Sequence, residues 1–141
     1  MLFKKILVAY DGSAGAERAL ETAIKLAHEQ GTELCVISVE EQLPHYAATV
    51  GEMDEEKERT NHYFEKLLLR AAEQAAVAGV TIRPQVLAGQ PAKTILKYSE
   101  DGRFDLLVMG RSGHGGTWGR FMGTTTDKVT RHAGCTVMVV V

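Results

Sequence analysis

Glycines are concentrated in one stretch of the second half of the chain. Six of the 14 glycines follow an apolar run and precede a predicted helix: Gly110, Gly113, Gly115, Gly116, Gly119 and Gly123. Because glycine adopts positive φ and has no Cβ, such a backbone can approach a ligand and turn consecutive amides towards an anion. The first amides of the following helix lack internal partners and lie at the positive end of its dipole. Together with the hydroxyls of Thr124 and Thr125, this pattern predicts a phosphate-binding site.

A flexible surface connection is the alternative for this stretch, because glycine clusters often serve that purpose. We favour the phosphate site, since strand-to-helix connections are commonly short and this one also carries His114, Thr117 and Arg120. Trp118 is expected simply to anchor the loop to the core. Two familiar phosphate motifs are absent: the sequence has no G-x-x-x-x-G-K-[ST], and residues 12–15 read Gly-Ser-Ala-Gly rather than G-x-G-x-x-G.

Short apolar runs alternate along the chain with longer amphipathic segments. Four of the runs are nearly continuous in Val, Ile and Leu, as expected for strands that are covered on both faces. The run over 80–87 alternates instead and contains Pro84, which indicates an edge strand. The predicted strands cover residues 6–9, 34–39, 80–87, 106–109 and 137–141.

Apolar residues at helical spacing occupy the segments between these strands. Ser13 is placed to cap the first predicted helix, and Gly31 to end it. Gly79 ends the second helix, and Pro91 suits the first turn of the third. A fourth helix is predicted over about 124–133.

This order of strands and helices predicts an α/β fold, with an open parallel sheet and helices on both faces. Right-handed crossovers leave few topologies, and ligands of such sheets bind at the carboxyl ends of the strands where the strand order reverses. The glycine-rich stretch begins at one of these strand ends. Residues 40–54 are expected to form the one long irregular connection, followed by a solvated helix start in the charged run 54–59.

Length and composition limit the possible classes of protein. With 141 residues, 45% hydrophobic and 24% charged, the chain fits one folded, water-soluble domain over residues 1–141. The net charge is −2 and the 16 Lys and Arg are scattered, so we expect no nucleic-acid partner. No apolar stretch approaches the ~20 residues of a membrane span, and the run after Lys5 is too short for a signal peptide. We therefore expect a cytoplasmic protein without membrane contact, with Cys35 and Cys135 as reduced thiols.

The glycine spacing resembles the ATP-binding pattern of the universal stress protein family, G-x2-G-x9-G-[ST]. The pattern is reproduced without a gap by Gly110, Gly113, Gly123 and Thr124. Residues 4–13 also look like the opening of that family, residues 105–110 like its fourth strand, and residues 131–135 like its usual R-H-A-x-C ending. The family often has proline at the next position, where this chain has Thr136; the change bears on entry into the last strand rather than on the nucleotide.

The resemblance implies a Rossmann-like, five-stranded parallel sheet of order 3-2-1-4-5, with ATP across the carboxyl ends of the first and fourth strands. It implies a nucleotide-dependent regulatory module of the stress response, with Mg²⁺ accompanying the phosphates. By position, Asp11 would lie near the adenine or ribose, and the backbone of Val39 would meet the adenine edge. The other matching residues would hold the phosphates or lie alongside them: Gly110, Gly113, Gly123, Thr124, Thr125, Met109 and Arg111.

The last predicted strand also bears on assembly. Residues 136–141 are almost wholly apolar, and the implied order places them at the edge of the sheet without a lysine or proline to prevent pairing. A two-fold homodimer formed through this strand is therefore expected, and the resemblance implies the same. The alternative is a monomer in which the fourth helix covers the strand.

An enzyme that uses the same pocket, a slow ATPase or phosphotransferase, is the alternative to a binding module. Phosphoryl transfer needs a base or water-orienting group, and neutralisation of the γ-phosphate. Arg111 and Arg120 offer charge, but no base is evident and Asp11 is expected nearer the nucleoside, so we favour the module. A receiver-like phosphoacceptor role for Asp11 lacks the aspartate required after the third strand, and the histidines and cysteines show no metal-binding spacing.

Overall fold

The structure, a computed structural model, describes residues 2–41, 50–111 and 123–141. Strands and helices alternate along these ranges, and every predicted strand boundary lies within two residues of the observed one. The strands are β1 (Ile6–Ala9), β2 (Leu34–Glu40), β3 (Ile82–Ala88), β4 (Leu106–Gly110) and β5 (Thr136–Val140). The helices are α1 (Ala14–Gln30), α2 (Val50–Val77), α3 (Pro91–Asp101) and α4 (Thr124–His132).

The strands form one parallel sheet in the order β3-β2-β1-β4-β5. Ile6 of β1 stands opposite both Leu34 of β2 and Leu106 of β4, so the three central strands begin at the same level. β3 lies at one edge with Pro84 opposite Val36, as its proline predicts. The predicted fold class and strand order are confirmed.

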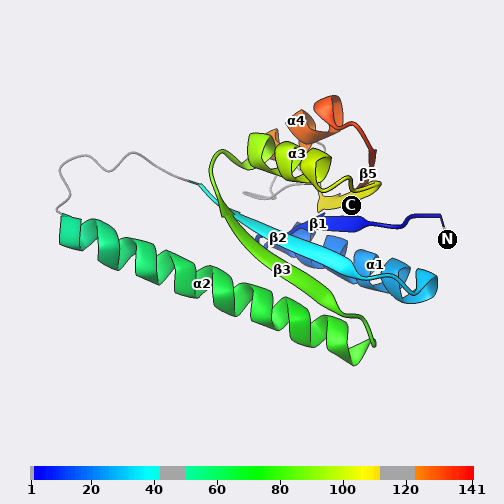
Figure 1. The fold of residues 1–141 in the computed structure, drawn as a ribbon, viewed down its shortest axis with the longest axis horizontal. Coiled ribbons are helices and arrows are strands. Elements are labelled where there is room, and N and C mark those ends of the chain that lie inside the picture. Colours follow the sequence, from blue (N-terminus) through cyan, green and yellow to red (C-terminus); the bar gives the residue numbers. More distant parts are fainter. Residues whose placement is uncertain (1, 42–49, 112–122) are drawn as a thin grey trace.

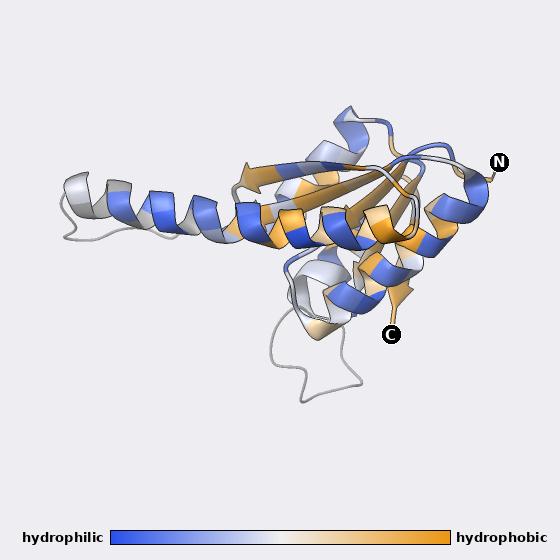
Figure 2. Cartoon of the chain, turned by 90° about the horizontal axis from the view of Figure 1, so that it is seen from below, coloured by the Kyte–Doolittle hydropathy of each residue, from blue (hydrophilic) through white to orange (hydrophobic). Residues whose placement is uncertain are grey.

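Two helices cover each face of the sheet (Figure 1). On one face, Leu20 of α1 and Leu68 of α2 belong to the core that includes Val8 of β1. On the other face, Ile95 of α3 and Val129 of α4 belong to a second core. Figure 2 shows the central strands as hydrophobic along their length, because they are buried on both sides.

The helix ends follow the capping residues in the sequence. The Ser13 hydroxyl accepts a hydrogen bond from the Ala16 amide at 3.2 Å, and Gly31 ends α1 in the left-handed conformation at φ 67°. The side-chain oxygen of Gln90 caps α3 by accepting a first-turn amide at 2.7 Å, and Pro91 follows it. The predicted roles of Ser13, Gly31 and Pro91 are therefore confirmed.

α2 begins earlier than the sequence suggested. Residues 40–54 were expected to be irregular, but β2 includes Glu40 and α2 already starts at Val50. This first half of α2 extends past the edge of the sheet, so it needs no apolar stripe of the kind that marks a packed helix (Figures 1 and 2). Acidic residues and good helix formers in its first turns favour the helix locally. The prediction was wrong for residues 50–54, whereas residues 42–49 lie outside the described ranges.

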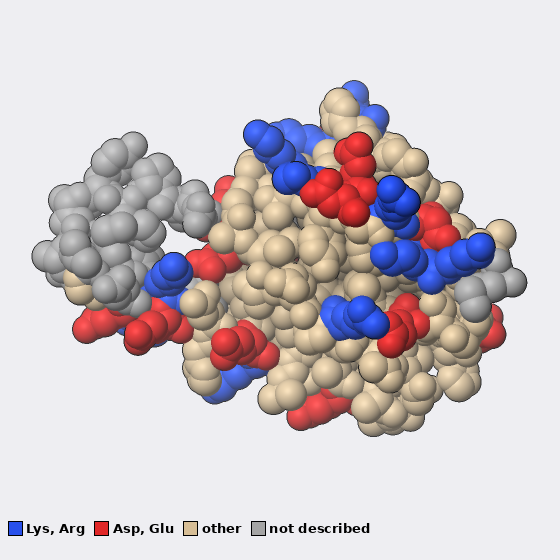
Figure 3. All heavy atoms as spheres, viewed as in Figure 1, with Lys and Arg blue, Asp and Glu red and all other residues tan. Residues whose placement is uncertain are grey.

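Acidic and basic side chains are interspersed over the face of the molecule drawn in Figure 3. That face therefore carries no broad field of one sign. Within the described ranges, no helix is both long enough and apolar enough to span a membrane. The same ranges contain no group of three or more His, Cys, Asp or Glu residues that could hold a metal ion.

The two cysteines lie far apart in the sheet. Cys35 is in β2 and Cys135 directly precedes β5, so β1 and β4 separate them. At ~4.8 Å per strand spacing, the separation is too great for a disulfide. Both thiols are free, as predicted.

The backbone of α1 lies very close to the end of β4. A Cβ on Gly110 would lie 2.5 Å from the carbonyl carbon of Gly15 and 2.6 Å from its oxygen. These are backbone atoms in the first turn of α1, so they cannot rotate away as a side chain could. Gly110 is thus required by packing, whatever else it does.

We expect Gly110→Ala to lower the free energy of unfolding by about 1–3 kcal/mol, because the added methyl group must push β4 and α1 apart. Gly134→Ala is the matched control, since a Cβ at that position meets no atom within 4 Å. We expect this control to change stability by less than ~0.5 kcal/mol. Urea denaturation followed by circular dichroism measures both variants, and equal stabilities would contradict the close approach.

Candidate functional site

A cavity of about 590 Å³ opens at the carboxyl ends of the central strands. It lies where the strand order reverses, because the helices that follow β1 and β4 pack on opposite faces of the sheet. Its wall combines the ends of β1, β2 and β4 with residues of α2, α3 and α4. Its volume and position are typical of a small-molecule site.

The structure brings seven of the nine predicted site residues to this cavity. Arg111 is not part of the lining; its amide donates to the Val140 carbonyl at 3.2 Å, and its carbonyl accepts from the Gly123 amide at 2.7 Å. Gly113 lies outside the described residues. The seven that line the cavity are Asp11, Val39, Met109, Gly110, Gly123, Thr124 and Thr125.

The N-terminus of α4 opens into the cavity without a side-chain cap. Its N-cap is Gly123, and no described side chain accepts a hydrogen bond from its first turn. In the first backbone hydrogen bond of this helix, the Asp127 amide donates to the Gly123 carbonyl at 2.9 Å. The amides of Thr124 and Thr125 precede that bond and have no partner within the helix. This end of α4 is therefore suited to an anion, with the positive end of the dipole behind it.

Thr126 fixes the start of α4 to the end of β4. Its side chain is buried, and its Oγ1 donates a hydrogen bond to the Gly110 carbonyl at 2.9 Å. Gly110 in turn lies against α1. The N-terminal end of α4 is thus held by a buried polar contact to a buried strand.

The loop after β1 is tied to β2 through both backbone polar groups of Tyr10. The Tyr10 amide donates to the Ile37 carbonyl at 2.8 Å, and the buried Ser38 hydroxyl donates to the Tyr10 carbonyl at 2.6 Å. Asp11 follows on the exposed side, where its Oδ1 accepts from the Ser13 amide at 2.9 Å. The Asp11 carboxylate therefore also shapes the turn into α1, a role that is compatible with ligand contact.

The Tyr10 side chain joins the cavity wall to α1. Its hydroxyl donates a hydrogen bond to the Glu17 carboxylate. Burial, followed by that hydrogen bond, raises the pKa of Tyr10 well above its ordinary value. The phenol therefore stays protonated and remains a donor throughout the physiological pH range.

α2 contributes residues that the sequence did not point to. Tyr63 and Phe64 line the cavity, with ring centroids 5.3 Å apart in an edge-to-face arrangement. One turn on, Leu67 packs on Gly12, where a Cβ would lie 2.7 Å from its Cδ1 atom. The apolar spacing of Phe64 and Leu67 indicates a packed face of α2, but it does not show that this turn of the helix reaches the strand ends. Aromatic residues in a long helix carry no signal of such a position.

The cavity has one apolar part and one part lined by backbone amides. Ile37, Val39 and Met109 supply aliphatic atoms, and the N-terminus of α4 supplies the amides. Asp11 and Glu41 are the carboxylates of the lining, and no described lining residue is His, Lys or Arg. This arrangement suits a ligand that combines a flat apolar ring system with an anionic group.

Both the sequence and the fold are similar to those of known proteins. The family model described as the universal stress protein family matches residues 2–141. A universal stress protein of Thermus aquaticus is 37% identical over 142 residues, which cover 99% of each chain. The universal stress protein UspA from Lactobacillus plantarum has the same fold, with a TM-score of 0.88 at 24% identity over 98% of this chain and 97% of that one.

Two further solved structures of similar fold contain nucleotides. One is a universal stress protein in complex with cAMP, with a TM-score of 0.77 at 23% identity over 100% of this chain and 99% of the other. The second is the universal stress protein from Archaeoglobus fulgidus in complex with dAMP, with a TM-score of 0.68 at 22% identity over 100% of both chains. At these identities the likeness concerns the fold alone.

We expect Thr126→Val to lower the free energy of unfolding by about 1–2 kcal/mol, because valine has nearly the same shape but leaves the Gly110 carbonyl without its donor. Thr130→Val is the matched control: its Oγ1 bonds at 2.9 Å to the Asp127 carbonyl of its own helix, a weaker local contact. Chemical denaturation should therefore show a clearly smaller loss for the control. Equal losses would mean that Thr126 does not join α4 to β4 in solution.

Proposed function

The chain belongs to the universal stress protein family, and we propose that it is an ATP-binding regulatory module of the stress response, acting in the cytoplasm. The observation that carries this proposal is the uncapped N-terminus of α4, which opens into a cavity that is also lined by Ile37, Val39 and Met109. A nucleotide has the matching parts, since its base is flat and largely apolar and its phosphates are anionic. The nucleotides named for the two related complexes support the same class of ligand.

In this proposal the nucleotide lies across the ends of β1 and β4. Asp11 contacts the adenine or ribose, and the backbone at the end of β2, at Val39, meets the adenine edge. Mg²⁺ accompanies the phosphates and binds chiefly through their oxygens, as Mg²⁺ commonly does at nucleotide sites. The residues assigned to the phosphates or alongside them are Met109, Gly110, Arg111, Gly113, Gly123, Thr124 and Thr125.

We favour a binding module over an enzyme because of what lines the α4 end of the cavity. The described residues there are glycine and threonine, which offer amides and hydroxyls but no general base. Asp11 lies on the β1 side and is hydrogen-bonded to the turn before α1. Phosphoryl transfer also needs a group that orients the attacking nucleophile at the γ-phosphate. Occupancy of the site is therefore proposed to act through binding.

The direct test is to identify the nucleotide that copurifies. Mass spectrometry of the small molecules released by gentle denaturation should find an adenine nucleotide, and calorimetric titration should then find tighter binding of ATP than of GTP. Steady-state phosphate release by the protein and by Asp11→Ala provides the enzymatic comparison. Fast turnover that Asp11→Ala abolishes would show that the protein is an ATPase rather than a binding module.

We expect Gly113→Val to abolish ATP binding while the protein stays folded. A side chain at this position would obstruct the approach of the backbone to the phosphates, and the residue belongs to the glycine-rich stretch rather than to a strand. Isothermal titration measures the affinity, and circular dichroism reports the fold of the same sample. An unchanged affinity for ATP would show that Gly113 is not part of the binding site.

We also propose that the protein is a homodimer formed through β5. The four residues Val137 to Val140 are only half-buried in one chain, and no strand of the described residues pairs with the outer edge of β5. Met138 and Val140 pack towards one core and Val137 towards the other. Antiparallel pairing with β5 of a second copy would satisfy the open backbone groups of both chains.

We expect Val139→Lys to convert a dimer of 15.4 kDa chains into a monomer, because it places a charge in the middle of the proposed strand pair. Light scattering at micromolar concentration reports the mass. Gln85→Lys is the control, since it adds the same charge to an exposed position on the opposite edge strand, β3. A dimer that survives Val139→Lys, or a wild-type monomer, would exclude β5 as the interface.

A further inference from the structure

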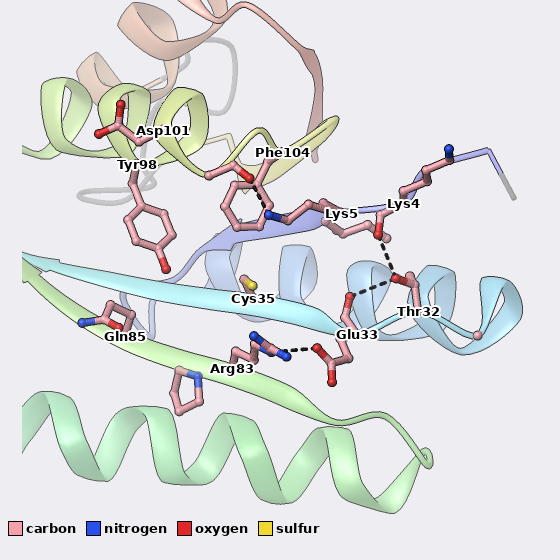
Figure 4. A pocket seen from close by; sticks show the side chains of 14 residues that line it. Lys4, Lys5, Thr32, Glu33, Cys35, Arg83, Gln85, Tyr98, Asp101 and Phe104 are labelled. Atoms are coloured by element: carbon pink, nitrogen blue, oxygen red, sulfur yellow. Dashed lines mark hydrogen bonds and ion pairs between the residues drawn. The ribbon is translucent and has the colours of Figure 1, made fainter.

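A second cavity, of about 730 Å³, lies at the opposite, amino end of the sheet between α3 and the strands β2 and β3 (Figure 4). We call it the amino-end cavity. It shares no lining residue with the cavity at the carboxyl ends. It exists because α3 has only 11 residues and does not reach across to β3, where Arg83 and Gln85 remain exposed.

Hydrogen-bond donors from four segments converge on this cavity. Lys5 precedes β1, Cys35 lies in β2, Arg83 and Gln85 lie in β3, and Tyr98 comes from α3. Figure 4 shows the Tyr98 hydroxyl pointing towards the sheet, with Cys35 between the Lys5 ammonium and the Arg83 guanidinium. Ammonium, thiol, guanidinium, amide and phenol groups can all donate. The lining is therefore matched to a ligand rich in acceptors.

Lys5 and Arg83 have donor capacity beyond their contacts in the protein. The Lys5 ammonium donates to the Gly102 carbonyl at 2.5 Å and lies 4.8 Å from the centre of the Phe104 ring. It has three N–H groups, so two remain for another acceptor. Arg83 forms an ion pair with Glu33 at 2.7 Å, but a carboxylate can take at most two of its five N–H groups.

The carboxylates that line the cavity leave N–H donors of Lys5 and Arg83 available to a ligand. Glu33 is the partner of Arg83, and both side chains are more than half exposed. Asp101, the other carboxylate of the lining, is paired with Lys97 at 3.0 Å. Exposed pairs of this kind are weak and exchange readily with other anions. An anionic ligand can therefore compete for Arg83.

An aromatic wall completes the cavity on the side of α3. The rings of Tyr98 and Phe104 are stacked, with centroids 5.8 Å apart and planes 23° apart. Burial raises the pKa of both the Tyr98 hydroxyl and the Cys35 thiol, so both remain neutral donors. The cavity thus combines an apolar wall with the cations Lys5 and Arg83, the combination that selects an anion attached to a flat apolar body.

We propose that the amino-end cavity binds a small aromatic carboxylate, with its ring against Tyr98 and Phe104 and its carboxylate between Lys5 and Arg83. This second site is independent of the nucleotide. The proposal does not rest on the function of the carboxyl-end cavity, because the two sites are built from different residues.

The test uses 2-naphthoate as the probe, in calorimetric titrations of the full chain. We expect saturable binding at one site per chain, and at least about tenfold weaker binding to Arg83→Gln, which loses a charge-assisted contact. Arg131→Gln is the matched control: Arg131 has the same 71% side-chain exposure as Arg83 and also pairs with a carboxylate, but lies on α4 outside the cavity. Its affinity for the probe should equal that of the wild type.

Two further measurements locate the probe. Bound 2-naphthoate should slow alkylation of Cys35 by iodoacetamide but leave Cys135 unaffected, since only Cys35 lines the cavity. Saturating ATP should not displace the probe, and neutral 2-naphthylmethanol should bind at least about tenfold more weakly. Absence of saturable binding, equal losses in Arg83→Gln and Arg131→Gln, or displacement by ATP would each overturn the proposal. None of these results depends on whether the carboxyl-end cavity binds ATP.

Discussion

The first turn of α1 lies directly on the backbone at the end of β4, so closely that a Cβ on Gly110 would come within 2.5 Å of Gly15. This contact sets the distance between β4 and α1, the helix that follows β1. The helix after β4 packs on the other face, so the two helices diverge from the strand ends. The cavity at the carboxyl ends forms because these two helices lie on opposite faces of the sheet. The close packing of α1 on β4 requires glycine at position 110, independently of any ligand.

The groups around that cavity are positioned by buried hydrogen bonds rather than by surface loops. Ser38 holds the Tyr10 carbonyl at 2.6 Å, and Thr126 holds the Gly110 carbonyl at 2.9 Å. Both side chains are buried, so breaking either bond would leave a polar group without a partner in the interior. The amides at the start of α4 are thereby fixed before a ligand arrives, which is the condition for strong anion binding by backbone groups.

Most of the fold was predictable because its signals are local. Continuous apolar runs located the strands, Pro84 identified an edge, and Ser13 and Gly31 bounded α1. The glycine spacing pointed to the residues that meet at the strand ends, because that spacing belongs to one loop. Tyr63 and Phe64 could not be found in this way, since their place depends on where a long helix crosses the sheet. The early start of α2 was missed because a helix that extends past the sheet lacks the apolar periodicity on which prediction depends.

The two ends of a parallel sheet differ in their electrostatics, and this difference explains why the two cavities are lined so differently. Helix N-termini gather near the carboxyl ends of the strands, so backbone amides there can hold an anion, as we propose for α4. Helix C-termini gather at the amino ends, where their carbonyls repel anions. The Lys5 ammonium already donates a hydrogen bond to one of these carbonyls, that of Gly102 at the end of α3. An anion site at this end must therefore be built from cationic side chains, and Lys5 and Arg83 supply more donors than the carbonyl and the carboxylate beside them can use.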